Sequence, residues 1–154
     1  MKPMILVIAI LALLQTSNAA SPIFPPKSVQ SLLKPILDLR AQAESSEGGK
    51  QQAAFAKSEK LIANLFQMKT RTSDEALVVL MNFYVGESLQ PDLVHQVTLR
   101  GKRMLPLLLK YKSASVAFAD RKYPRSLLLA DDIRQMGFDN AIDSIRTGKV
   151  FGPE

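Results

Sequence analysis

The chain has 154 residues, a formal net charge of +6, and neither cysteine nor tryptophan. The lack of cysteine excludes disulfide frameworks, zinc–thiolate sites and thiol catalysis. After removal of the N-terminal segment described next, a single domain of about 135 residues remains, which is long enough to bury a core without disulfides.

The N-terminus has the three parts of a secretory signal peptide. Lys2 supplies a positive charge, residues 4–14 form an unbroken apolar run, and a short polar stretch leads to Ala19 and Ala20. We expect cleavage after Ala19, with cleavage after Ala20 as the alternative, so residues 1–19 are the predicted signal peptide. A membrane anchor is disfavoured because a helix needs about twenty apolar residues to cross a bilayer.

Export through this signal would place the mature chain in a periplasm or outside the cell. Secreted animal proteins of this size often carry disulfides, so the lack of cysteine favours a bacterial envelope. It also argues against a lipid-anchored lipoprotein. No later segment is long and apolar enough to span a membrane, so we expect a soluble mature chain without a transmembrane segment.

After the signal, residues 20–27 contain three prolines and predict an extended lead-in. Residues 28–148 are predicted to form a single helical domain, and residues 149–154 a flexible tail. The first helix begins near Ser28, and Pro35 either kinks it or starts a later helix. A polar stretch ends this segment before a second helix begins near Lys50. The apolar positions expected to be buried by these two helices are Val29, Leu32, Leu33, Ile36, Leu37, Ala54, Leu61, Ile62, Leu65 and Met68.

The third helix has a predicted capping box, with Thr72 as N-cap and Glu75 bonding back to it. We expect this helix to end at Gly86. Its predicted buried face comprises Leu77, Leu80, Met81, Tyr84 and Val85. Pro91 then has the position of a first helical residue, and the fourth helix is expected to end at Gly101.

A fifth helix is predicted over residues 102–112, with Pro106 in its first turn or at a kink. This segment is apolar around most of its circumference, which predicts a central place in the core. Residues 113–119 are compatible with a strand, a helix continuation or a loop.

A sixth helix is expected over residues 126–136, with Gly137 as its end, and a seventh from Asp139 as N-cap to Gly148. The predicted buried residues of these two helices are Leu128, Leu129, Ile133, Met136, Ile142 and Ile145.

The fold class is therefore all-α, with about six to seven short helices in antiparallel hairpins. Two arrangements are open. One is a stack that resembles HEAT or armadillo arrays, because a Pro-aliphatic-aliphatic sequence occurs both at Pro35 and at Pro106. The other is a compact irregular helical bundle.

The sequence contains no recognisable catalytic, cofactor-binding or metal-binding motif. His95 is the single histidine, and the paired carboxylates Asp139 and Asp143 share a helix face, although Asp139 is better explained as a cap. No Gly-x-Ser-x-Gly elbow, phosphate-binding loop or calcium loop is present. We expect no cofactor and no metal. The sequence leaves open whether the chain is an enzyme, although the lack of a catalytic motif argues against it. The enzymatic alternative is a small cell-envelope hydrolase using carboxylates with His95.

The positive charge is concentrated in residues 100–125, which contain eight basic residues and one acidic residue. This basic stretch is the candidate binding face. Its basic residues are Arg100, Lys102, Arg103, Lys110, Lys112, Arg121, Lys122 and Arg125. Such a patch attracts acidic groups, provided that its members lie on one side of the fold.

These features favour a non-enzymatic interaction or scaffold module that uses the basic stretch. For an exported protein the expected partner is another protein or an anionic envelope component rather than nucleic acid. The sequence leaves the specific partner and the oligomeric state open.

Overall fold

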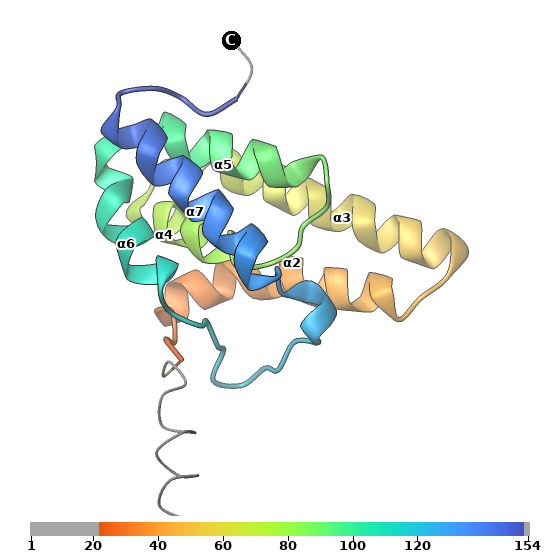
Figure 1. Cartoon of the computed structure of the whole chain (residues 1–154). Coiled ribbons are helices and arrows are strands. Elements are labelled where there is room, and N and C mark those ends of the chain that lie inside the picture. Colours follow the sequence, from red (N-terminus) through yellow and green to blue (C-terminus); the bar gives the residue numbers. More distant parts are fainter. Residues whose placement is uncertain (1–21, 153–154) are drawn as a thin grey trace, which may run out of the picture.

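The computed structural model describes residues 22–152 and shows six α-helices in this part of the chain (Figure 1). They are α2 (Lys27–Glu44), α3 (Gly48–Gln67), α4 (Arg71–Leu80), α5 (Leu89–Leu99), α6 (Leu105–Lys112) and α7 (Asp131–Arg146). Two 3₁₀ helices cover Gly101–Met104 and Arg125–Leu127. The described residues form isolated bridges but no strand, so the predicted all-α fold is confirmed. The predicted signal peptide, residues 1–19, lies outside the described residues and stays a prediction.

The short helix α4 forms the centre of the core. Residues 76–80 are all 0% exposed, and α4 contacts α2, α3, α5 and α6. A helix buried around its whole circumference needs neighbours on every side, and α4 has them. We expected α6 in this place, but α6 buries only Leu108 and Tyr111 and exposes Leu109. That expectation was wrong because α6 is covered on one side only.

The helices form a bundle of hairpins. Pairs α2–α3, α4–α5 and α6–α7 are in contact, and α4 also contacts both α2 and α6. A regular array contacts only neighbouring repeats. Here the segment between α6 and α7 returns to α2, and the helices differ in length. Pro35 lies inside α2 whereas Pro106 is in the first turn of α6, so the two proline sequences do not mark equivalent positions of a repeat.

The capping box of α4 lies two residues before the predicted one. Thr70 is the N-cap: its hydroxyl accepts from the Ser73 N–H at 3.1 Å, and the Ser73 hydroxyl accepts from the Thr70 N–H at 3.0 Å. Ser73 can replace the usual Glu because it supplies the same acceptor. Glu75 instead accepts a hydrogen bond from the Tyr111 hydroxyl at 2.6 Å, so α6 holds the carboxylate that we assigned to the cap.

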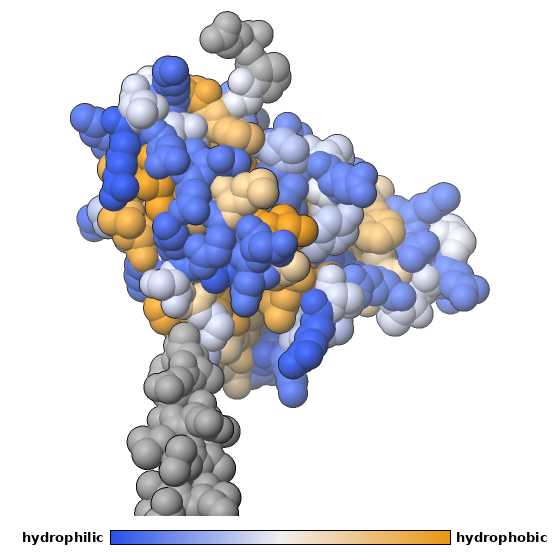
Figure 2. Space-filling model, in the orientation of Figure 1, coloured by the Kyte–Doolittle hydropathy of each residue, from blue (hydrophilic) through white to orange (hydrophobic). Residues whose placement is uncertain are grey.

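The last two predicted helices are a single helix, α7. Gly137 lies inside it, and a methyl group there would find only the Met81 side chain at 4.0 Å. One interior glycine costs about 1 kcal/mol, too little to end a helix that packs on its neighbours. Ile133 and Met136, predicted to be buried, are 53% and 62% exposed. Figure 2 shows apolar areas among the hydrophilic side chains on the face where α7 lies. Asp139 is an interior residue of α7 rather than its cap.

Two prolines are accommodated without ending a helix. Pro35 lies on the exposed side of α2, which continues to Glu44. Pro91 lies in the first turn of α5, where a missing N–H leaves no intrahelical bond unmade. The prediction for Pro106 is confirmed, because it also lies in a first turn.

The connector between α4 and α5 differs from the prediction of a longer helix. α4 ends at Leu80, and Gly86 has a φ of +114°, a conformation that favours glycine, in the turn that leads to α5. Val85 is buried as expected. Tyr84 is 37% exposed, so its predicted burial was wrong. The rest of the connector is mostly buried, and its backbone pairs at Asn82 and Tyr84 with the segment described next.

Candidate functional site

Residues 113–130, between α6 and α7, form an irregular segment that we call the strap. In Figure 1 the strap leaves α6, passes along α2 and returns to the start of α7. Lys34 and Asp38, one turn apart on α2, hold it in place. The Lys34 ammonium pairs with Asp120 at 2.7 Å, and the Asp38 carboxylate pairs with Arg121 at 3.2 Å and accepts a hydrogen bond from the Tyr123 hydroxyl at 2.9 Å.

Backbone hydrogen bonds fix the strap at both ends. The Ile23 N–H donates to the Ser115 carbonyl at 2.7 Å, and the Ala117 N–H donates to the Ile23 carbonyl at 3.0 Å. At the other end the Tyr84 N–H donates to the Leu127 carbonyl at 2.7 Å. The strap therefore joins the residues before α2 to the connector after α4.

Two aromatic rings of the strap pack against a third ring, from the connector between α4 and α5. Phe118 and Tyr123 lie edge to face with their centroids 5.5 Å apart, and Phe83 lies 6.1 and 6.2 Å from them. Phe83 and Phe118 are buried. Burial raises the pKa of the Tyr123 hydroxyl, and its hydrogen bond to Asp38 raises it further. Tyr123 is therefore held neutral, as a hydrogen-bond donor, at physiological pH.

A pocket of about 240 Å³ opens beside these rings, and we call it the strap pocket. Phe83, Phe118 and Tyr123 line it together with Ala117, and three cationic residues of the strap also line it. These cationic residues, which we call the cationic rim, are Arg121, Lys122 and Arg125. Arg121 pairs with Asp38, whereas Lys122 and Arg125 are exposed and form no ion pair within residues 22–152. The pocket thus combines an aromatic floor with two cations, Lys122 and Arg125, that form no ion pair in the described residues.

The other end of the basic stretch has a different environment. Arg100 is buried, with 2% of its side chain exposed, and pairs with Asp74 of α4 at 2.7 Å. Its guanidinium also donates to the Ser73 hydroxyl at 3.0 Å and to the Met68 carbonyl at 2.6 Å. Arg100 therefore joins the C-terminus of α3 to the N-terminus of α4. It does not lie on an exposed face, which corrects its inclusion in the predicted binding surface.

Three further cations of the stretch pair with acidic residues of other helices. Arg103 pairs with Asp74 at 3.0 Å, Lys110 with Glu75 at 3.2 Å and Lys112 with Asp139 at 2.5 Å. Lys102 is exposed. The first cluster of the stretch, Arg100 to Lys112, is thus attached to α4 through Arg100, Arg103 and Lys110 and to α7 through Lys112. The second cluster, Arg121 to Arg125, is attached to α2 through Arg121 alone.

His95 contacts the C-terminal segment rather than a carboxylate. Its Nδ1 donates to the Phe151 carbonyl at 2.5 Å, and the Phe151 N–H donates to the Thr98 hydroxyl at 3.0 Å. The segment for which we predicted a flexible tail is thus attached to α5 at Phe151. Within residues 22–152 no acidic side chain bonds to His95, and no group of three or more metal-binding side chains gathers. The hydrolase alternative requires an acidic side chain within hydrogen-bond reach of His95, and residues 22–152 do not provide one.

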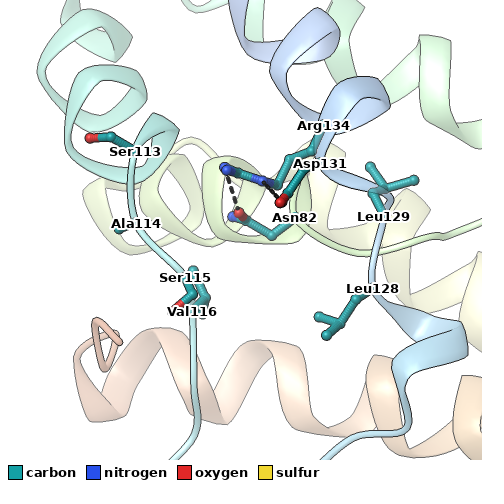
Figure 3. Close-up of a pocket in the computed structure, with 9 residues that line it drawn as sticks. All are labelled: Asn82, Ser113, Ala114, Ser115, Val116, Leu128, Leu129, Asp131 and Arg134. Atoms are coloured by element: carbon teal, nitrogen blue, oxygen red, sulfur yellow. Dashed lines mark hydrogen bonds and ion pairs between the residues drawn. The ribbon is translucent and has the colours of Figure 1, made fainter. Parts of the chain in front are cut away.

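A second pocket of about 240 Å³ lies between the strap and α7 (Figure 3). Arg134 reaches into it from α7, toward Asn82 and Asp131. Its guanidinium donates to the Lys112 carbonyl at 2.8 Å and to the Tyr111 carbonyl at 3.3 Å, at the C-terminus of α6. A cation in that place satisfies terminal carbonyls and complements the helix dipole. The charge of Arg134 is therefore used within the fold, unlike the charges of the cationic rim.

A second buried arginine, Arg40 of α2, lines none of these pockets. It is 5% exposed, lies 4.7 Å from the centroid of the Phe55 ring and forms no ion pair within residues 22–152. Burial lowers its pKa, and the more distant charges of Glu59, Tyr84 and Glu44 act in the opposite direction. Arg40 is accordingly a packing residue between α2 and α3 rather than part of a ligand site.

Comparison with protein-family models, curated proteins and solved structures found no match to this chain. None of the helices in residues 22–152 has the length and apolar character needed to cross a bilayer. The functional argument therefore depends on the geometry of the strap pocket alone.

The sequence located part of this site. The basic stretch of the sequence includes Arg121, Lys122 and Arg125, but Asp38, which holds Arg121 and Tyr123, was not among the predicted site residues. Phe83 and Phe118 were missed as well, because they lie outside helical periodicity. One feature of the sequence could have indicated this site: Arg121, Lys122 and Arg125 are close in sequence to the aromatic residues Phe118 and Tyr123.

Proposed function

We propose that this chain is a non-enzymatic interaction module that binds an acidic partner protein through the strap pocket. The observation that carries the proposal is the cationic rim around an aromatic floor, where Lys122 and Arg125 have no ion pair within the described residues. Complementary charge increases the rate of encounter and selects an acidic partner.

The way in which the strap is held supports this role. Asp38 fixes Arg121 and Tyr123, and backbone bonds from Ile23 and Tyr84 fix the neighbouring segments. A surface that is already ordered loses less conformational entropy on binding. In the first cluster of the basic stretch, by contrast, four of the five cations are paired within the fold, and Lys102 alone has no ion pair in the described residues.

The proposal is tested with a fluorescein-labelled peptide of seven glutamates, whose binding is measured by fluorescence anisotropy. We expect saturable binding that weakens as salt is raised from 50 to 300 mM, because exposed charges are screened. The double variant Lys122→Glu/Arg125→Glu should lose at least about tenfold in affinity. The matched control is Lys50→Glu/Lys69→Glu, which changes the net charge equally at exposed lysines outside the pocket. Equal loss in both double variants, or no binding, would refute the proposal.

We further propose that the chain is exported, so that its partner is a protein of the periplasm or the extracellular space. The support is the predicted signal peptide, residues 1–19. Production of the full chain in a bacterium, followed by mass spectrometry of the exported fraction, should return a chain that begins at Ala20 or Ser21. Recovery of the chain only in the cytoplasm with Met1 and Lys2 intact would contradict export.

A further inference from the structure

We propose that the strap pocket receives one aromatic side chain of an extended acidic segment of the partner, with the flanking carboxylates bound by the cationic rim. This inference rests on the proposed function and specifies its ligand. It concerns what enters the pocket, whereas the proposed function concerns only attraction of acidic groups to its edge.

The size of the pocket selects a single ring. Its volume is about 240 Å³. A cavity of about 150 Å³ can hold benzene, whereas pockets for drug-sized ligands and cofactors span about 300–1,000 Å³. The strap pocket therefore has room for one side chain of a partner and not for a nucleotide or a comparable cofactor.

The floor of the pocket favours an aromatic occupant. The edge-to-face contacts of Tyr123 with Phe118 and Phe83 show that the rings already pack in the arrangement that aromatic groups prefer. A further ring can continue this arrangement and cover apolar surface. The pocket is a local hollow with cations beside it, so an acyl chain, which needs an extended apolar groove, fits it less well.

The rim favours carboxylates on either side of that ring. Lys122 and Arg125 are exposed, and Arg121 is oriented by Asp38, so positive groups stand at the edge of the hollow. An arginine fork can bind a carboxylate through two parallel hydrogen bonds. A segment in which acidic residues flank a tryptophan, tyrosine or phenylalanine matches both parts of the site.

The chain contains no tryptophan, so a tryptophan in a peptide can be observed selectively. The probe is an acetylated and amidated heptapeptide with a central tryptophan flanked by three acidic residues on each side. The probe is mixed with the protein as purified from the cells that express the full chain. Its emission should show a saturable blue shift as the indole enters the pocket. A matched peptide with alanine at the centre, measured as a competitor, should bind at least about tenfold more weakly.

Two variants test the two parts of the site. Lys122→Glu/Arg125→Glu should weaken binding of both peptides. Ala117→Leu partly fills the pocket from its wall without removing a buried ring, and it should weaken only the tryptophan peptide. Lys50→Glu/Lys69→Glu should leave both affinities within about twofold. Phe118→Ala is avoided because loss of a buried ring endangers folding.

The outcomes separate the two proposals. Equal affinity of the tryptophan and alanine peptides, with loss of both in Lys122→Glu/Arg125→Glu, would overturn the aromatic inference and leave the proposed function standing. Binding of neither peptide would overturn both. Tighter binding to phosphatidylglycerol vesicles than to either peptide, abolished by the same double variant, would replace the peptide by an anionic lipid surface.

Discussion

At one end of the basic stretch, Arg100 is buried between α3 and α4 and bonds to Asp74 and to backbone carbonyls. At the other end, Lys122 and Arg125 are exposed beside aromatic rings and have no ion pair within residues 22–152. The two regions contribute the same kind of charge to the sequence. What differs is the position of the acidic residues, which lie elsewhere in the chain. Asp74, Glu75 and Asp139 pair with four cations of the first cluster, whereas Asp38 pairs only with Arg121 in the second. A run of basic residues therefore indicates an available surface only after its counter-charges are located.

The largest expected effect comes from the buried end. Arg100→Met should lower the free energy of unfolding by about 3 kcal/mol, because Asp74 loses its buried partner and keeps only the half-exposed Arg103 as a counter-charge. Urea denaturation measures this change. Lys102→Met is the matched control at an exposed neighbour and should stay within about 0.5 kcal/mol of the parent. A loss below about 1 kcal/mol for Arg100→Met would show that the two ends do not differ in the way proposed.

Each region also holds a tyrosine that should make the fold sensitive to alkali. Burial raises the pKa of Tyr111, bonded to Glu75, and of Tyr123, bonded to Asp38, above the ordinary value of 10.0. The unfolded chain loses these protons first, so stability is complete below pH 10 and falls as the pH rises above it. Each tyrosine contributes a loss of up to about 1.4 kcal/mol per pH unit.

Denaturation at a series of pH values measures this loss. Tyr111→Phe and Tyr123→Phe should each make the decline above pH 10 shallower, and the double variant should reduce it further. A decline that is unchanged in both single variants would contradict the assignment to these two groups.

A variant of Arg40 tests whether Arg100 stabilises the fold through its burial or through its ion pair. Arg40 is buried but forms no ion pair within residues 22–152, so Arg40→Met leaves no buried partner uncompensated. We expect a change between zero and a gain of about 1 kcal/mol in unfolding free energy, the stacking on Phe55 offsetting part of the desolvation that is relieved. Thermal and urea denaturation measure it. A loss as large as that of Arg100→Met would mean that burial alone decides the effect.

The smallest expected effect on stability comes from the strap. Lys122→Glu/Arg125→Glu should change the free energy of unfolding by less than about 0.5 kcal/mol, because both side chains are exposed and unpaired in the described part of the chain. The measurement is urea denaturation of the same preparations used for peptide binding. A loss above about 2 kcal/mol would assign the rim a structural role and would weaken the binding argument.

Much of the helical framework could be predicted from local patterns. Leu33 and Leu37 in α2, and Ile62 and Leu65 in α3, follow helical periodicity and are buried as expected. Predictions failed where one local sequence feature is compatible with two structures. Gly137 can end a helix or lie inside one, and the packing of α7 on α5 and α6 decided for the second.

The candidate site was harder to predict because its parts come from distant segments. Asp38 of α2, Phe83 of the connector and the strap meet only in the folded chain. An irregular segment such as the strap has no hydrophobic periodicity. Its tertiary contacts therefore cannot be predicted from its own sequence. The paired first cluster was overestimated as a surface for the same reason, since its partners Asp74 and Glu75 precede it by more than twenty residues.

The sequence by itself determined the class of the fold, the approximate positions of α2 and α3, and the concentration of positive charge in residues 100–125. These properties depend on near neighbours in the chain, through helical periodicity and composition. The tertiary structure alone decided that α4 occupies the core, that Arg100 is buried and that Lys122 and Arg125 are available. These properties depend on which distant residues supply apolar contacts and counter-charges, and that pairing exists only once the helices have packed.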